Sequence, residues 1–202
     1  MSTLRRRVVA GAAVLACATP FGVAQAQSAT DDQLNRAVAV TEQDGSRAFD
    51  FAWQLDRQRG GVVEHRNIAN AAARCTDCRA TAIAFQVVLA SRGSTVGTVR
   101  NQAVAINDQC TNCVVYAGAR QFVRVIADAN NAAFTDEGRA TLSDVRNDLR
   151  ALEDQNLDVD ALTAAVEAQE ARVLKVLTEE VVTSDGDEVS YRTQVNRQAN
   201  DG

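Results

Sequence analysis

A repeated motif with two cysteines constrains this chain more than any other feature of its sequence. The tetrapeptide CTDC at residues 75–78 recurs as CTNC at residues 110–113, thirty-five positions later. The same offset relates the residues that follow each motif: Ala82, Ala84, Gln86 and Val88 recur as Ala117, Ala119, Gln121 and Val123. An alanine-containing segment that begins with asparagine also precedes each motif. The sequence therefore contains a duplicated unit, and both copies should fold in the same way.

Each copy of this unit is predicted to run from a strand through the cysteine turn into a helix. Small residues alternate before the cysteines, as in a closely packed strand. Thr76 or Thr111 can cap a helix by accepting a hydrogen bond from a free backbone N–H. The apolar residues after the motifs fit helical spacing: Ala80, Ile83, Ala84, Val87 and Val88 in the first copy, and Val115, Ala119, Phe122, Val123 and Ile126 in the second.

Two further segments show clear periodicity. Residues 49–55 alternate aromatic or aliphatic side chains with small or polar ones, and Gly60-Gly61 is a turn signal, so we expect a β-hairpin whose second strand runs from Val62 toward Ala73. Residues 134–182 carry apolar residues at steps of three and four, with a break near residue 155 and Asp158 or Asp160 as the N-cap of the second helix. This pattern predicts a helical hairpin that covers the sheet, or alternatively contacts a protein partner.

We therefore predict an α+β fold: a small antiparallel or mixed sheet with two CTxC-initiated helices, followed by a C-terminal helical hairpin. The expected organisation is a signal peptide at 1–26, a polar lead-in at 27–46, the α+β domain at 47–130, the helical hairpin at 134–182 and a polar tail at 183–202.

The N-terminus has the composition of a cleavable signal peptide. Three arginines at residues 5–7 precede an apolar stretch at 8–18, and Ala24-Gln25-Ala26 is a small-x-small cleavage site. We expect cleavage near Ala26 and a secreted or extracytoplasmic protein. A loose twin-arginine pattern and a weak lipoprotein box at Cys17 leave the export route open.

The charge of the mature chain limits its partners. Removal of residues 1–26 takes away three arginines and no acid, so 18 basic residues remain against 26 acidic ones and the net charge becomes −8. This balance disfavours nucleic acid and anionic lipid as partners. No second apolar run follows the signal peptide, so we expect no transmembrane segment in the mature chain. The partner stays unknown, and the C-terminal helices are one surface where a protein could bind.

The duplicated motif also supplies a resemblance. The Asn-x-Ala segment, the CTxC tetrapeptide and the following Ala-x-Ala-x-Gln resemble those of exported proteins and extracytoplasmic segments of high-GC Gram-positive bacteria that have no assigned activity. The resemblance covers about residues 47–127 and leaves the C-terminal helices unmatched. It implies an extracytoplasmic location and a cysteine framework, and it transfers no active site.

The cysteines Cys75, Cys78, Cys110 and Cys113 allow four interpretations. Disulfides can form within each motif, as export to an oxidising compartment and the identical geometry of the copies favour. They can also form across the motifs, which would staple one copy to the other. The spacing further suits a four-thiolate zinc site. Lastly, a CxxC at a helix start is where a thiol–disulfide oxidoreductase holds its thiolate, although no proline follows residue 26 to position a substrate.

No catalytic set accompanies these cysteines. The sole histidine, His65, lies beside Glu64 in the predicted second strand, where we expect a surface or interface residue. A phosphate-binding loop, a nucleophile elbow and a zinc-protease motif are all missing from the sequence. We expect no cofactor and no catalytic residue. The sequence favours an exported protein with a structural or interaction role, stabilised by CxxC disulfides; the alternative is an extracytoplasmic thiol–disulfide or zinc-binding module that uses the paired motifs.

Overall fold

The computed structural model describes residues 33–97, 99–183 and 190–201, and the predicted signal peptide lies outside them. The first part of the described chain consists of the strands β1 (Leu34–Thr41), β2 (Arg47–Gln58), β3 (Val62–Val63), β4 (Arg66–Ala73), β5 (Arg79–Ser91), β6 (Thr95–Val96), β7 (Arg100–Asn107) and β8 (Val114–Ile126). The second part consists of β9 (Ala133–Phe134), α1 (Asp136–Ala151), a 3-10 turn (Leu152–Asp154), α2 (Val159–Glu179), β10 (Val181–Val182) and β11 (Ser190–Asp201).

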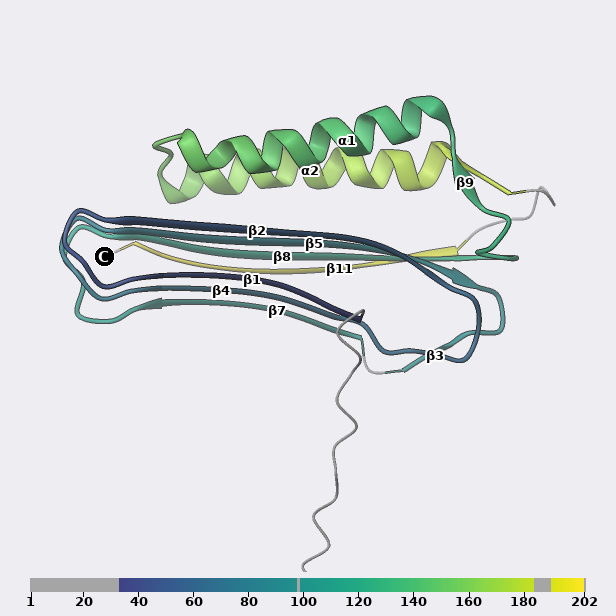
Figure 1. The fold of residues 1–202 in the computed structure, drawn as a ribbon, viewed down its shortest axis with the longest axis horizontal. Helices are drawn as coiled ribbons and strands as arrows, with labels where there is room; N and C mark the ends of the chain where they lie inside the picture. The colour runs from purple at the N-terminus through teal and green to yellow at the C-terminus, as the bar shows by residue number, and fades with distance from the viewer. Residues whose placement is uncertain (1–32, 98, 184–189, 202) are drawn as a thin grey trace, which may run out of the picture.

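The long strands form two stacked sheets. Within the described residues, sheet A has the order β1-β4-β7 and sheet B the order β11-β8-β5-β2. All neighbours are parallel except β11, which runs antiparallel to β8. The chain passes from sheet A to sheet B and back, and each pass adds one strand to each sheet (Figure 1). This arrangement is a flat β-solenoid, and we call its successive passes rungs 1, 2 and 3.

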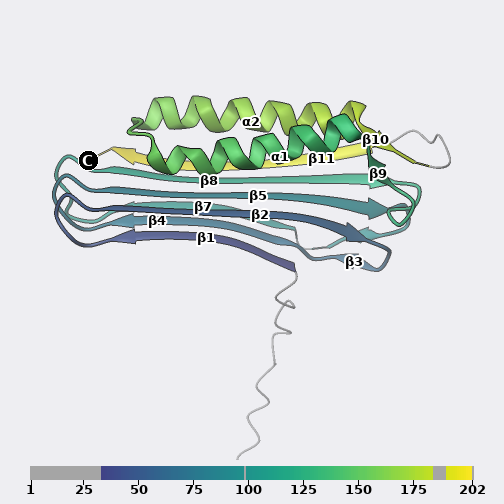
Figure 2. The same cartoon turned by 45° about the horizontal axis from the view of Figure 1, so that its top comes forward.

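The prediction of an α+β fold with two CTxC-initiated helices was wrong. The segments that follow the motifs are the strands β5 and β8, and two stacked sheets, parallel throughout except for β11, replace the single small sheet. Every residue of β5 after Arg79 is buried, because sheet A covers one face of sheet B and the helices α1 and α2 cover the other (Figure 2). A strand buried on both faces loses its two-residue alternation, so its apolar run fits a helical pattern equally well.

The predicted β-hairpin was wrong for a related reason. β2 does form over the alternating segment, but it pairs in parallel with β5, whereas β4 lies in sheet A between β1 and β7. Gly60 and Gly61 have φ of 154° and 76°, which only glycine adopts readily, and they turn the chain toward the other sheet.

The repeat begins earlier than the sequence indicates. β1, within the predicted polar lead-in, is paired residue by residue with β4, so residues 34–63 form a further copy of the unit. In this rung Gln43 and Ser46 take the places of Cys75 and Cys78, because the offset between rungs 1 and 2 is 32 residues. Without cysteines, rung 1 lacks the signature by which the other copies are recognised.

Alanine fills the space between the sheets. The inward-facing positions of both sheets are mostly alanines, and all of them stack in register from rung to rung: Ala37, Ala69 and Ala103; Ala39, Ala71 and Ala105; Ala80 and Val115; Ala82 and Ala117; Ala84 and Ala119. Such small side chains allow the backbones of the two sheets to approach closely, as in a steric zipper.

Asparagine side chains between the sheets join the rungs. The Asn35 amide donates to Asn67 Oδ1 at 2.7 Å, and the Asn67 amide donates to Asn101 Oδ1 at 2.8 Å. The Asn67 amide also reaches backbone carbonyls of sheet B, those of Ala84 and Arg120, at 3.0 Å. The ladder therefore connects neighbouring rungs and, at the same time, the two sheets.

A second ladder, of glutamines, lies next to the asparagine ladder, since Gln86 and Gln121 closely follow the residues of sheet B that Asn67 contacts. The Gln121 amide donates to Gln86 Oε1 at 2.5 Å, and the Gln86 amide donates to Gln54 Oε1 at 2.7 Å. All three residues occupy equivalent positions of β8, β5 and β2.

The helices α1 and α2 lie side by side over the outer face of sheet B (Figures 1 and 2). Thr135 caps α1 by accepting from the Gly138 N–H, and Asp158, one of the two predicted residues, caps α2 by accepting from the Ala161 N–H. The main hydrophobic core forms between helices and sheet, and it includes Phe85, Phe122, Tyr116, Val145, Leu149, Leu162, Val166, Val173 and Leu177. Because both halves share this core, the predicted segments 47–130 and 134–182 belong to one domain.

A buried ion pair fastens α2 to the sheet. Arg120 of β8 is fully buried, and its Nε lies 2.7 Å from Glu170 Oε2, which is 17% exposed. The remaining segment, predicted as a polar tail, contains β11, which pairs with β8 from Ser190 opposite Val125 to Asp201 opposite Val114. None of the helices in the described part of the chain is long and apolar enough to cross a membrane.

We predict that the asparagine ladder is a large contribution to stability. Asn67→Ala removes the hydrogen bonds from the Asn67 amide to Asn101 Oδ1 and to two backbone carbonyls of sheet B, so the free energy of unfolding should fall by about 2–4 kcal/mol. Asn70→Ala, on the outer face of the same strand, should change it by less than about 0.5 kcal/mol. Urea unfolding of both variants measures the difference, and equal losses would contradict the role of the ladder.

Candidate functional site

The two cysteine motifs form consecutive turns at one end of the solenoid, on the left of Figure 1. The first links β4 to β5 and the second links β7 to β8. Thr76 and Thr111 form a parallel bridge, and the Asp77 N–H donates to the Thr111 carbonyl at 2.9 Å. The strand stacking therefore continues through the turns.

The structure brings the sulfurs together within each motif. Cys75 and Cys78 lie at disulfide distance with their Cα atoms 6.0 Å apart, and Cys110 and Cys113 do so with a Cα separation of 5.8 Å. Both separations fall in the range that disulfides require. Cys75, Cys78 and Cys113 are buried, at 8%, 3% and 2% exposure.

The turns also stack on each other through the cysteines. Cys110 Sγ accepts from the Cys75 N–H at 3.4 Å, and Cys113 Sγ lies 3.0 Å from the Cys75 carbonyl oxygen. The turn of rung 1, which has no cysteine, joins the stack through its backbone: the Gly45 N–H donates to the Thr76 carbonyl at 2.8 Å, and the Thr76 N–H donates to Asp44 Oδ1 at 2.7 Å.

The third position of each motif has a left-handed backbone. Asp77 has φ of 56° and Asn112 has φ of 58°, a conformation that Asp and Asn tolerate better than other non-glycine residues. Their side chains are joined, because the Asn112 amide donates to Asp77 Oδ1 at 2.5 Å. The second turn is one residue longer than the first, and Gln109, at φ 55°, lies in the added length.

The arrangement removes one argument for a redox site. No helix begins at either motif in the described residues, so the expected helix start, whose dipole would stabilise a thiolate, is not present there. Thr76 and Thr111 bridge to each other and cap no helix. In the part of the chain that the structure describes, no group of three or more His, Cys, Asp or Glu side chains is placed to hold a metal ion.

His65 lies at the other end of the solenoid and is buried, contrary to the expected surface position. Its ring is 3% exposed, and its Nδ1 lies 3.4 Å from Asp56 Oδ2 and 3.5 Å from the Gln86 amide nitrogen. Burial lowers the pKa of His65 below its usual value of 6.5. The histidine thus extends the glutamine ladder as a neutral core residue.

No helix of the described residues covers the outer face of sheet A (Figures 1 and 2). Val38, Val40 and Ile106 are 36%, 55% and 51% exposed on it. Shallow depressions of 330 Å³ and 150 Å³ lie on this face, lined by Val40, Asn70, Ala72, Gln102, Val104 and Ile106 and, toward the cysteine turns, by Glu42, Arg74 and Asp108. We call this surface the bare face.

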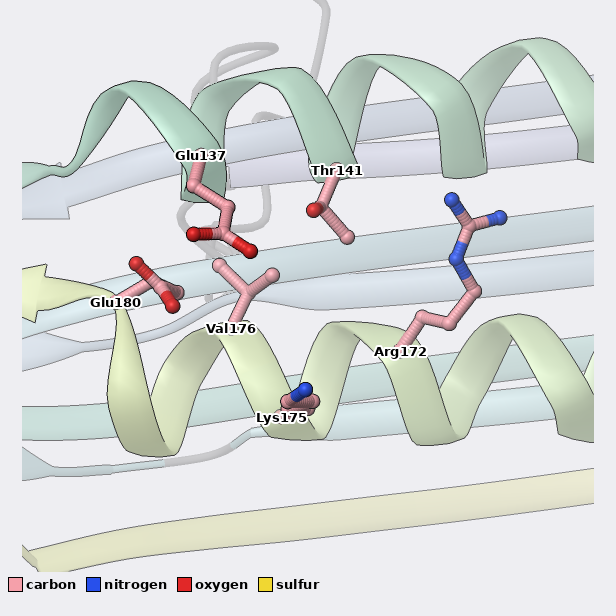
Figure 3. A pocket seen from close by; sticks show the side chains of 6 residues that line it. All are labelled: Glu137, Thr141, Arg172, Lys175, Val176 and Glu180. Carbon is pink, nitrogen blue, oxygen red and sulfur yellow. The ribbon is translucent and has the colours of Figure 1, made fainter.

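A depression of 230 Å³ lies between α1 and α2 (Figure 3). Its basic side chains already have acidic partners, since Arg172 lies 2.6 Å from Asp148 and Lys175 lies 3.8 Å from Glu179. Glu180 accepts a hydrogen bond from the Thr135 hydroxyl. The first pair and the Thr135–Glu180 hydrogen bond link the two helices, and the Lys175–Glu179 pair lies within α2, so the polar groups of the depression serve the packing of the hairpin.

Comparisons of the chain with protein-family models, with curated proteins and with solved structures gave no match. The class of this protein therefore rests on its own geometry: a β-solenoid with stacked CTxC turns at one end and a helical hairpin over one sheet.

The left-handed turn gives a prediction at Asn112. Asn112→Val places a β-branched residue at φ 58° and should lower the free energy of unfolding by about 1–2 kcal/mol. Asn112→Gly removes the same amide but suits the backbone, so it should stay within about 0.5 kcal/mol of the wild type. Equal effects of the two variants in chemical denaturation would contradict the backbone argument.

The buried histidine should make the free energy of unfolding depend on pH. Since the pKa of His65 is lowered by folding, the unfolded chain binds the proton more readily below pH 6.5, and the free energy of unfolding should fall as the pH drops below that value. Above pH 6.5 the contribution should be constant. His65 is the sole histidine of the chain, so His65→Gln should flatten the profile between pH 6.5 and the onset of carboxylate titration. An unchanged profile in the variant would show that the slope has another source.

Proposed function

We propose that this chain is an exported structural protein of the cell envelope or the medium, which acts by contact and is stabilised by disulfides within its CTxC motifs. The observation that carries the proposal is the stack of turns at the cysteine end. Each disulfide would lock the turn between sheet A and sheet B in its rung, and backbone hydrogen bonds extend this constraint to the turn of rung 1.

Export supports the same function. Residues 1–26 have the three regions of a signal peptide, and an oxidising compartment is where disulfides form and persist. A solenoid with an alanine core buries little apolar area per residue between its sheets, so covalent closure of its turns adds stability where it is needed. The net charge of −8 after cleavage favours contact with protein over nucleic acid.

The alternative function, a thiol–disulfide or zinc-binding module, needs free or exchangeable thiolates. Cys75, Cys78 and Cys113 are almost fully buried, which limits access by a thiol or a substrate disulfide. Intact mass of the protein released by its native host separates the two functions. We expect cleavage after Ala26, a mass four hydrogens below that of the reduced chain, and no free thiol. Free thiols with one zinc per chain would instead support the module.

The disulfides should contribute to stability separately. Each closes a four-residue loop, for which chain entropy gives about 2 kcal/mol. The paired changes Cys75→Ser with Cys78→Ser, and Cys110→Ser with Cys113→Ser, should each lower the free energy of unfolding by about that amount. A variant in which all four of these cysteines are replaced by serine should remain folded but lose its resistance to protease. If oxidised and reduced wild-type protein unfold at the same denaturant concentration, the stabilising role is wrong.

A further inference from the structure

The strand β2 is an open edge of sheet B. It is 12 residues long and, among the described residues, it is hydrogen-bonded to a strand on one side only, by β5. Backbone N–H and C=O groups on its other side therefore point away from the sheet at alternate residues. A long strand with such an edge is a template for a further strand.

The side chains of β2 make this edge apolar. Phe49, Phe51, Trp53 and Leu55 lie on the side that faces the helices, and all are half-buried at the margin of the main core. The Trp53 ring stacks on Phe85 at 6.0 Å between centroids. A strand added beside β2 would cover the open side of these residues and complete the margin of the core.

The neighbouring edge of sheet A is protected. The Val38 N–H of β1 donates to Asp50 Oδ2 of β2 at 2.6 Å, so a carboxylate already occupies the place of a further strand. An inward-pointing charged residue of this kind is a common means of blocking an edge. At the opposite end of sheet B, β11 is rich in polar residues and lacks a run of aromatic residues.

We propose that β2 pairs antiparallel with β2 of a second copy of this chain, about a two-fold axis at Ala52. With Ala52 opposite its own counterpart, Phe51 lies opposite Trp53, Phe49 opposite Leu55, and Asp50 opposite Gln54 of the other copy. Aromatic and aliphatic side chains then meet across the pair on one face, which stabilises antiparallel strands. The like-charged pair of Arg47 and Arg57 falls at the exposed ends of the strands.

This self-complementarity identifies a second copy as the occupant. The pairing uses the same strand of both chains, so it closes on itself and produces a dimer, with sheet B continuous across both copies. The contact consists of one strand pair and its aromatic margin, which is small for a protein interface, so the dimer should dissociate on dilution.

Sedimentation of the purified mature protein tests the inference with two matched variants. The wild type should change from dimer to monomer over a ~100-fold dilution. Ala52→Lys places like charges face to face at the axis and should leave only monomer, while Val38→Lys adds the same charge on the bare face and should keep the dimer. Circular dichroism verifies that both variants fold. A wild type that is monomeric throughout, or a dimer lost in Val38→Lys and kept in Ala52→Lys, would overturn the proposal.

Crosslinking provides a test that does not depend on the lysine variant folding. Ala52→Cys should give a covalent dimer under mild oxidation, because directly opposed residues of an antiparallel pair approach within reach of a disulfide. Val38→Cys, on the bare face, should remain monomeric.

Trp53 is the sole tryptophan, so its emission should shift to shorter wavelength as the dimer forms. Fibres or a ladder of oligomers would indicate head-to-tail contact and contradict the closed pair.

Discussion

The pairing of identical asparagine amides from rung to rung, between the two sheets, is the interaction on which the rest of this structure depends. Asn35, Asn67 and Asn101 lie between the sheets, where each amide finds its partner only if the rungs stack in register. A shift by one residue would turn the amides outward and bring the outer residues of the strand into the core. The same register aligns the alanine rows, and it brings the CTxC turns one above the other at the end of the strands.

The residues of sheet B explain why the helices α1 and α2 cover its outer face. Its inner face is shaped by alanine and the amide ladders, so the large apolar side chains are on the outer face, where α1 and α2 bury them. The ion pair between Arg120 and Glu170 fixes the hairpin at a buried position, where loss of one partner would leave a charge without its counterion. Sheet A needs no such cover, because its outer face mixes exposed valines with arginine, asparagine and glutamine.

The sequence predicts the parts of this fold that carry a local signal. The helices with the cap at Asp158, the strand at β2 and the repeated unit are all recognisable from period and motif. The sequence does not show that β5 and β8 are strands rather than helices, because burial on both faces removes the alternation of apolar and polar residues that marks a strand. Rung 1 is not recognisable as a copy of the repeat from the sequence, because its turn has Gln43 and Ser46 in place of cysteines. β11 is missed because its sequence is a polar segment, although it pairs with β8 along its length.

In this fold the cysteine turns lead into stacked parallel strands. NMR assignment of the oxidised protein tests it most directly, through the secondary chemical shifts of residues 80–91 and 115–126. We expect extended-strand shifts over both segments, together with nuclear Overhauser contacts between the side-chain amides of Asn67 and Asn101, which lie in hydrogen-bond contact. Helical shifts after the CTxC motifs, without those contacts, would contradict the solenoid.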